Sequence, residues 1–441
     1  MHDDSRRRTP RTDVVLADPR LAEGMRRLGR RAVKDAVTAA LQACRGGALA
    51  PEEVVDRVLA ALPQSATSLR RVVNATGVVV HTNLGRAPLS AAAADAVVLA
   101  AGATDVELDL ATGRRGPRGA GALAALAAAV PDAGGVHVVN NGAAALTLVT
   151  CALAHGGREV VVARGEMVEI GDGFRIPELL ESVGARLREV GTTNRVRLAD
   201  YAAAVNQDTA FVLKVHPSNF RVVGFTSSVP LSELATLGVP VVADIGSGLL
   251  APHPRLPDEP DAASSLRSGA DLVTASGDKL LGGPQCGLLL GDADLVHGLR
   301  RHPLARALRV DKLTLAALEA TLTGPMTPVA MALASRPGEL RARADAIVEA
   351  IGSELAEAVP SLAAVGGGGA PGVELDSAAV SLPAHLAEPL RRGDPAVVGH
   401  VLDGRLLLDL IGVHQAQDAD LVEAVRQALG TPSPAPDTRD S

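Results

Sequence analysis

The sequence predicts an α/β protein in which a large domain follows a helical module and precedes a smaller α/β domain. Between about Val72 and Gly291, short Val- and Leu-rich runs end in Gly, Asn or Asp and are followed by Ala-rich stretches typical of helices. Apolar strands that alternate with helices predict a parallel sheet covered on both faces. Hydrophobic residues make up 47% of the 441 residues, which is enough for a sizeable core.

The N-terminal module is predicted over residues 1–70 as a basic helical segment. Residues 1–16 are polar, and we expect them to be disordered. From Leu21 the apolar residues recur at a spacing close to 3.6, which predicts a helix, and Pro51 begins a second one. Five basic side chains lie mostly away from the apolar stripe: Arg26, Arg27, Arg30, Arg31 and Lys34.

Charge is distributed unevenly along the chain. Through Val73 there are 14 Lys and Arg residues against 9 Asp and Glu, although the whole chain carries a net charge of −7. A basic module on an acidic body suits the binding of a polyanion, and solvated helix faces explain the same charges equally well. With four Phe, one Tyr and no Trp, an aromatic platform for stacking single-stranded nucleic acid is nearly excluded.

The large domain is predicted over residues 71–325 and the small C-terminal domain over residues 326–441. Strands of the large domain are expected at Val136–Val139, Val160–Ala163, Phe211–Val215, Val239–Ala243 and Asp271–Thr274. The small domain is expected to hold a Gly366–Gly369 loop, strands around Gly372–Leu382 and Leu406–Leu410, and a disordered tail over residues 431–441.

The cysteines and the hydropathy exclude several classes of protein. Cys44, Cys151 and Cys286 are far apart, and no CxxC or CxxH spacing occurs, so neither a disulfide framework nor a metal site is expected. No apolar run is long enough to cross a membrane, and the N-terminus has no apolar targeting segment. We therefore expect a cytoplasmic protein that binds no membrane.

The sharpest local feature is the Gly-rich loop Ser276–Gln285, which carries Lys279 between two strand-like runs. The chain has only four lysines and uses arginine everywhere else, and arginine cannot form an imine. Ser276 can bind a phosphate beside the same loop. A single lysine in a surface loop usually has no chemical role, so the hypothesis needs support from elsewhere in the chain.

That support comes from Asp244, which ends the apolar run before the lysine loop. A carboxylate at a strand end can pair with the ring nitrogen of pyridoxal phosphate, and an Asp in this position is as often a turn former. The order of strand-end Asp and later loop Lys favours the cofactor interpretation.

Two further strand ends offer polar groups to such a cofactor. Asn141, Gly142 and Ala143 lie where a strand turns into a helix, and the free N–H groups of a helix N-terminus suit a phosphate. His216 and Asn219 follow another strand and can contact the phenolic oxygen of the cofactor, although a simple polar turn explains them almost as well.

Three arginines are candidates for binding an anionic substrate. Arg86 follows an apolar strand and a turn, and Arg306 and Arg309 are spaced to share one face of a helix, where they can grip one oxyanion. Each of them, taken alone, is better explained as a solvated ion-pair partner.

Four stretches of the chain together resemble bacterial selenocysteine synthase, the L-seryl-tRNA(Sec) selenium transferase family. They are Arg71–Gly77 with Asn83–Leu89, Arg164–Gly171, Val190–Arg195 and Ser276–Gln285. The resemblance runs in order from about Leu21 to Leu429. Cys286 departs from the family pattern, where a small residue such as Ala is more usual, and we interpret it as a packing substitution.

The resemblance implies a fold-type-I pyridoxal-phosphate enzyme with an aminotransferase-like large domain. It implies that Lys279 holds the cofactor as a Schiff base and that Asp244 pairs with its ring nitrogen. The expected cofactor-binding set is Lys279, Asp244, Ser276, Asn141, Gly142, Ala143, His216 and Asn219.

The resemblance also implies the substrates and the assembly. Arg86, Arg306 and Arg309 are expected to bind selenophosphate, and the basic N-terminal module is expected to bind seryl-tRNA(Sec) and not DNA. The implied reaction eliminates the seryl β-hydroxyl and adds selenium, in a homo-oligomer built as a ring of dimers, a homodecamer. Selenocysteinyl-tRNA(Sec) is then the product.

Two other functions remain open on the sequence. The first is a pyridoxal-phosphate lyase on the same scaffold that acts on a small amino acid or amino sugar, against which the basic module argues. The second is a nucleic-acid-binding scaffold with a dead active site, against which the joint retention of Asp244, Ser276 and Lys279 argues.

Overall fold

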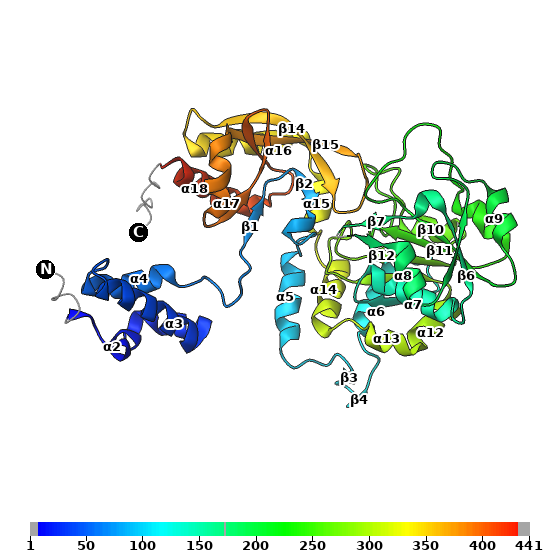
Figure 1. Cartoon of the computed structure of the whole chain (residues 1–441), viewed down its shortest axis with the longest axis horizontal. Helices are drawn as coiled ribbons and strands as arrows, with labels where there is room; N and C mark the ends of the chain where they lie inside the picture. The colour runs from blue at the N-terminus through cyan, green and yellow to red at the C-terminus, as the bar shows by residue number, and fades with distance from the viewer. Residues whose placement is uncertain (1–7, 172, 431–441) are drawn as a thin grey trace. The chain divides into compact units, whose positions relative to one another are not determined.

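The computed structural model describes residues 8–171 and 173–430, so the predicted disordered tail lies outside the described residues. Contacts between Cα atoms divide the chain into two compact units, Met1–Arg71 and Val72–Ser441. Each unit has its own hydrophobic core, and each is described by itself below (Figure 1).

The first unit is a small helical bundle made of α2 (Thr12–Leu16), α3 (Ala22–Arg45) and α4 (Val54–Ala61). The predicted helix after Leu21 is confirmed, although Gly29 interrupts α3 with a φ of 83°. The expected disorder through residue 16 is wrong over Thr12–Leu16, because Val15 and Leu16 are buried in the core of the bundle and stabilise this short helix.

The second unit is built on a seven-stranded sheet with the order β5-β13-β12-β11-β10-β6-β9. Its strands are β5 (Gly135–Val139), β6 (Glu159–Ala163), β9 (Arg186–Val190), β10 (Thr209–Val215), β11 (Val241–Gly246), β12 (Leu272–Ser276) and β13 (Gly287–Gly291). The five predicted strands are all present. The prediction of a parallel sheet is wrong at β13, which pairs antiparallel with both β12 and β5. A short loop from β12 returns the chain directly beside it, and such a connection can join only antiparallel strands.

Helices cover both faces of this sheet, as the apolar strands predict. Alternate residues of one strand belong to different clusters: Leu272 packs in a core that contains α7 (Gly142–Leu153) and α8 (Ile176–Ser182), whereas Val273 packs with α6 (Ala120–Ala129). The other covering helices are α9 (Leu198–Ala204), α10 (Leu231–Leu234), α11 (Ala262–Arg267), α12 (Ala293–Arg301), α13 (Pro303–Ala307) and α14 (Lys312–Thr323). The predicted α/β class is therefore confirmed.

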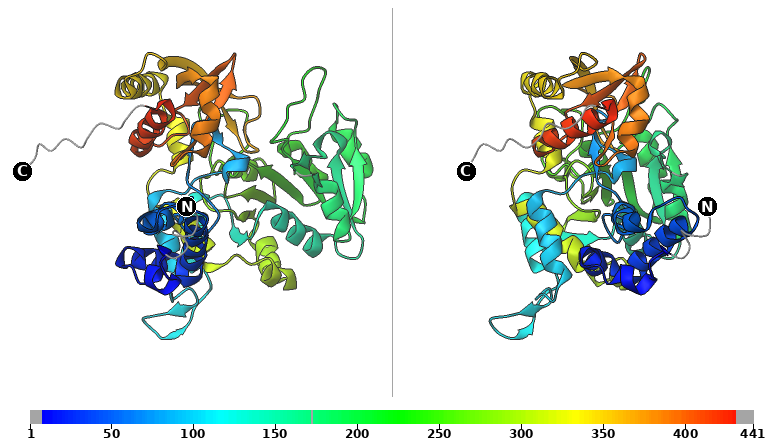
Figure 2. Two further views of the ribbon diagram at one scale, coloured as in Figure 1. Left: turned by 60° about the vertical axis from the view of Figure 1, so that its left-hand side comes forward. Right: turned by 90° about the vertical axis from the view of Figure 1, so that its left-hand side faces the viewer.

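A second sheet of five strands carries the C-terminal region, with the order β17-β18-β15-β14-β2. Its strands are β2 (Val78–Val80), β14 (Glu357–Gly366), β15 (Glu374–Pro383), β17 (His400–Leu402) and β18 (Arg405–Asp409). Figure 2 shows its yellow and orange strands as a sheet separate from the green strands of the larger one. β1 (Val72–Asn74) pairs with β16 (Ala396–Val398), so residues 72–80 join the C-terminal strands in space.

Five helices and two short hairpins complete the second unit. The helices are α5 (Ala91–Ala101), α15 (Pro328–Ala334), α16 (Pro337–Ile351), α17 (Ala387–Arg392) and α18 (Asp418–Leu429). The hairpins are β3 (Leu108–Asp109) with β4 (Arg114–Arg115), and β7 (Glu169–Ile170) with β8 (Phe174–Arg175).

A buried carboxylate, Asp409, ties the C-terminal sheet together. Its oxygens accept hydrogen bonds from Ser361 Oγ at 2.6 Å, Ser377 Oγ at 2.7 Å and the Ile411 N–H at 2.9 Å. Gly77 packs against the same carboxylate, because a Cβ added at this position would lie 3.4 Å from the Asp409 side chain. One side chain therefore satisfies polar groups from β14, β15 and the chain after β18.

We expect Asp409→Ala to lower the free energy of unfolding by about 3 kcal/mol, because it leaves buried donors without an acceptor. Urea denaturation of the full chain checks the value. Asp376→Ala, an exposed Asp on β15, is the control and is expected to change the free energy by less than about 0.5 kcal/mol. A loss at Asp409 no larger than that of the control would contradict the assigned role.

Candidate active site around Lys279

A pocket of about 310 Å³ opens at the carboxyl ends of β10, β11 and β12. Eight of the residues selected from the sequence line it together: Arg86, Asn141, Gly142, Ala143, His216, Asp244, Ser276 and Lys279. They come from separate strand ends, which a shared sheet edge brings to one place.

Lys279 lies in the loop between β12 and β13, and only 8% of the residue is exposed. The Leu280 N–H that follows it donates to the Ser247 carbonyl at 2.8 Å, which fixes the loop to the chain after β11. Burial lowers the pKa of the Lys279 amine below its ordinary value, the charge of Asp244 opposes this shift, and the charge of Arg86 adds to it. A neutral amine is a nucleophile, so the burial prepares Lys279 to attack a carbonyl group.

Asp244 lies on β11 beside Lys279, and its Oδ1 accepts a hydrogen bond from Thr274 Oγ1 of β12 at 2.8 Å. Burial raises the pKa of the Asp244 carboxyl, whereas the Thr274 hydroxyl and the charge of Lys279 act to lower it. A cationic group bound against Asp244 would also favour its ionised form. The carboxyl group is therefore suited to pair with a protonated ring nitrogen.

The N-terminus of α7 faces the same pocket. The Asn141 side chain caps this helix by accepting from the Ala144 N–H at 2.8 Å, and the next residues, Gly142 and Ala143, line the pocket. A Cβ on Gly142 would lie 2.9 Å from Ser276 Oγ, so a side chain there would collide with the hydroxyl. The space that glycine leaves open, at the positive end of a 12-residue helix, suits a phosphate group.

Arg86 is held at the pocket by Asp278, the neighbour of Lys279. Its Nη1 donates to Asp278 Oδ2 at 2.7 Å, and the Ala87 N–H donates to the Asp278 carbonyl at 3.2 Å. Arg86 adopts a φ of 66°, which is rare for a residue other than glycine. The tight turn after Gly85 therefore directs the guanidinium toward the lysine loop.

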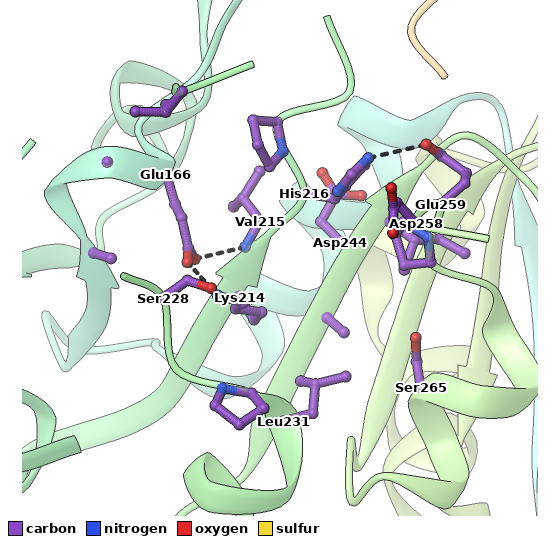
Figure 3. Close-up of a pocket in the computed structure, with 18 of the residues that line it drawn as sticks. Glu166, Lys214, Val215, His216, Ser228, Leu231, Asp244, Asp258, Glu259 and Ser265 are labelled. Atoms are coloured by element: carbon purple, nitrogen blue, oxygen red, sulfur yellow. Dashed lines mark hydrogen bonds and ion pairs between the residues drawn. The ribbon is translucent and has the colours of Figure 1, made fainter. Parts of the chain in front are cut away.

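His216 follows β10 and contacts a buried acid from a different loop. Its Nε2 lies 3.1 Å from Glu259 Oε2, and its backbone N–H donates to the Asp244 backbone carbonyl at 2.9 Å. Figure 3 shows this contact beside an ion pair between Lys214 and Glu166, which lines a neighbouring pocket of about 670 Å³. Glu166 Oε2 also accepts from the Val215 N–H at 3.1 Å, so this pair fixes the end of β10.

The structure does not bring the other predicted residues into the Lys279 pocket. Asn219 Nδ2 donates to the Glu169 carbonyl at 2.9 Å, and its side chain is not part of the lining. Arg306 and Arg309 line a separate pocket of about 620 Å³ together with His137. Arg309 Nη1 lies 3.7 Å from Glu107 Oε1. Burial, together with the charge of Arg300, lowers the pKa of His137 to about 4.

The basic residues chosen for nucleic-acid binding are all exposed on α3 of the first unit. Arg26 pairs with Glu23, and Arg27 donates to the Pro63 carbonyl at 3.3 Å. Arg30, Arg31 and Lys34 form no ion pair within residues 8–171 and 173–430. Of the five chosen residues, only Arg26 pairs with an acidic side chain in the part of the chain that the structure describes.

Sequence reasoning missed three charged residues of this region. Asp278 had a signal, because it directly precedes the selected lysine. Glu166 lies in a stretch that carries the family resemblance, but its partner Lys214 is distant in sequence. Glu259 had no signal at all, since Asp258-Glu259 between two prolines is typical of a solvated acidic loop.

Comparison with known proteins points to one family. Residues 72–414 match the family model described as L-seryl-tRNA selenium transferase, and residues 6–45 match the one described as selenocysteine synthase N terminal. The L-seryl-tRNA(Sec) selenium transferase of Hyphomonas neptunium is 41% identical over 96% of this chain and 98% of its own length. That of Moorella thermoacetica is 45% identical, with 82% of each chain covered.

Among solved structures, D-glucosaminate-6-phosphate ammonia-lyase has the same fold. It superposes with a TM-score of 0.57 and 19% identity, over 82% of this chain and 96% of its own. Within the described part of the chain, no helix combines the length and the apolar character needed to cross a membrane.

We expect the acylation of Lys279 by a small amine-specific reagent to reach its half-maximum below pH of about 10.4, the ordinary pKa of lysine. Asp244→Asn removes a charge that favours the cation and should move this midpoint lower, whereas Arg86→Met should move it higher. Peptide mass spectrometry across a pH series measures the labelling. A labelling midpoint that stays at the same pH in both variants would argue against the electrostatic coupling described above.

Proposed function

The chain belongs to the L-seryl-tRNA selenium transferase family, which converts seryl-tRNA(Sec) to selenocysteinyl-tRNA(Sec), and we propose that its Lys279 pocket performs this conversion with pyridoxal phosphate. One observation carries the proposal. A buried lysine with a lowered pKa, a strand-end carboxyl group and the N-terminus of α7, left open by Gly142, converge on one pocket.

The pocket fits the three functional parts of this cofactor. Lys279 supplies the amine for its aldehyde, and Asp244 supplies the acid for its ring nitrogen. Asn141, Gly142 and Ser276 surround the place for its phosphate, where the Cβ of any larger residue at position 142 would intrude. When bound, pyridoxal phosphate supplies an electron sink for the bonds at the amino acid Cα.

The chain itself has to move two protons. Lys279 would hold the cofactor, and its free amine could accept the proton from the seryl Cα, a role favoured by the burial that lowers its pKa. The β-hydroxyl needs a proton to depart, because hydroxide is a poor leaving group. Two histidines that follow strands could supply it, His216 after β10 and His81 after β2. Only His216 of the two lines the pocket, so we assign this proton to His216. The selenium of selenophosphate would bond to Cβ in place of the departed oxygen, Cα would regain a proton from Lys279, and water would cleave the P–Se bond to release phosphate.

Selenophosphate, the proposed selenium donor, requires cationic side chains. Arg86 lies in the Lys279 pocket and offers its guanidinium there. Arg306 and Arg309 line a different pocket of the same chain, so we propose that they act in a homo-oligomer, at the Lys279 site of a neighbouring copy. The exposed apolar side chains of Val98 and Leu99 on α5, 74% and 73% accessible, support an assembly that covers them.

A lyase acting on a small amine remains the second candidate, because its fold is shared by an ammonia-lyase of 19% identity. A likeness of that size supports the fold and not the substrate. The N-terminal bundle, which matches the selenocysteine synthase N-terminal family, favours the tRNA substrate.

We expect the purified protein to gain a visible absorbance band with pyridoxal phosphate that borohydride removes, because the band reports the bond to Lys279. Lys279→Arg keeps the charge but should lose both band and turnover, whereas Lys312→Arg, the matched control, should lose neither. Seryl-tRNA(Sec) should perturb the band and free serine should not. A band that responds to free serine and ignores the tRNA would establish the lyase instead.

Replacing Arg30, Arg31 and Lys34 together by Ala should weaken seryl-tRNA(Sec) binding by roughly 10- to 100-fold at moderate salt. The slope of log affinity against log salt should become shallower by about 2 to 3, since three phosphate contacts are lost. The control replaces three exposed arginines of the second unit by Ala, and it has the same net charge as the first variant. These arginines are Arg336, Arg341 and Arg391. Equal losses in both variants would show that α3 is not the specific contact.

A further inference from the structure

We propose that Glu259 is a positioning residue that holds the His216 ring and the loop over Lys279 with a single carboxylate oxygen. The inference rests on the proposed function, because it assigns Glu259 a part in the same reaction. Glu259 lies in the loop between β11 and α11, outside every stretch that carried the family resemblance.

The Glu259 side chain is buried to an unusual degree for an acid. Only 1% of it is exposed, although the neighbouring Asp258 is classed as exposed. A buried carboxylate costs free energy unless hydrogen bonds satisfy it. Its Oε1 has no partner within residues 8–171 and 173–430, so the residue is not placed there for stability alone.

Its other oxygen, Oε2, accepts two hydrogen bonds from distant parts of the chain. His216 Nε2 lies at 3.1 Å and the Ala370 N–H at 2.7 Å. A carboxylate can only accept, so His216 Nε2 must carry the proton in this pair, and Nδ1 becomes the nitrogen that exchanges protons. Figure 3 shows the ring of His216 turned toward Glu259 from the end of β10.

Ala370 belongs to the loop that connects β14 to β15 in the C-terminal sheet. The loop passes directly over Lys279, since a Cβ added to Gly368 would lie 3.0 Å from Lys279 Nζ and 3.6 Å from Ser218 Oγ. Ala370 has a φ of 47°, a left-handed conformation that costs a residue with a Cβ roughly 1–2 kcal/mol. The bond to Glu259 holds Ala370 in this conformation.

One carboxylate thus connects the proton-transferring histidine of the large sheet to the loop that covers the reacting lysine. The negative charge of Glu259 also favours the cationic form of Lys279, in the same sense as those of Asp244 and Asp278. We infer that Glu259 keeps the C-terminal loop closed while His216 presents Nδ1 for proton exchange. Opening of the loop would admit water to the Lys279 amine and make the lysine side chain more mobile.

Hydrogen exchange of the cofactor-free protein tests the contact directly. In Glu259→Ala the Ala370 amide, followed in a peptide spanning residues 366–373, should exchange roughly 10- to 100-fold faster, because a bond to a charged acceptor is lost. Glu259→Gln keeps an oxygen acceptor and should restore most of the protection. Asp258→Asn, the matched control, should leave the exchange unchanged.

The loaded enzyme then separates a positioning role from a structural one. Glu259→Ala should lower kcat for seryl-tRNA(Sec) at least tenfold with little change in KM, and should alter the circular dichroism of the bound cofactor. Glu259→Gln should partly rescue kcat. If Glu259→Ala does not fold, Glu259→Asp replaces it, since its shorter side chain cannot reach both partners.

Two results would overturn the proposal: unchanged exchange at Ala370 in Glu259→Ala, or faster exchange with an unchanged kcat. Failure of the proposed function would give a different result, because the wild-type protein would then gain no absorbance band with pyridoxal phosphate. The exchange of the cofactor-free protein would still decide whether the contact holds the loop.

Discussion

The burial of one amine, that of Lys279, is the constraint on which the rest of the site depends. Removing a lysine from water favours its neutral form, and the surrounding charges adjust how far. Asp244 and Asp278 favour the cation, whereas Arg86 opposes it. Because Asp278 also binds Arg86, the residue next to Lys279 fixes the guanidinium that would bind a substrate anion under the proposed function.

The two sheets of the second unit contribute different parts of this environment. The large sheet provides polar residues of the Lys279 pocket at the ends of β10, β11 and β12, and the C-terminal sheet provides the loop that passes over Lys279. Their cores are continuous, because Leu249, Leu256 and Leu280 pack in the same cluster as the C-terminal strands. The segment 72–80, which pairs with that sheet, leads directly into the turn that carries Arg86.

Features set by local pattern could be predicted from the sequence, and features set by distant pairing could not. Apolar runs that end in polar residues identify strand ends, and this pattern predicted the strands. It also led to Lys279, Asp244 and Asn141, which the structure places in one pocket. The antiparallel β13 was missed, since periodicity does not encode the direction of a strand. Glu259 was missed because its burial depends on a loop more than 100 positions away. The predicted helix face shared by Arg306 and Arg309 is wrong, because α13 ends at Ala307 and Arg309 forms a β-bridge with Val139 instead.

The connection between β12 and β13 has a consequence for how this architecture can change over time. Both legs of the hairpin are fully buried strands, and glycines within the loop approach neighbouring backbone too closely to accept a side chain. The covering loop is constrained in the same way, because a Cβ on Gly367 would lie 2.7 Å from the Val80 carbonyl oxygen and one on Gly368 would lie 3.0 Å from Lys279 Nζ. Both loops around the amine therefore exclude larger side chains, so new substrate preferences would evolve by changes elsewhere in the pocket lining while the lysine hairpin and its cover stay constant.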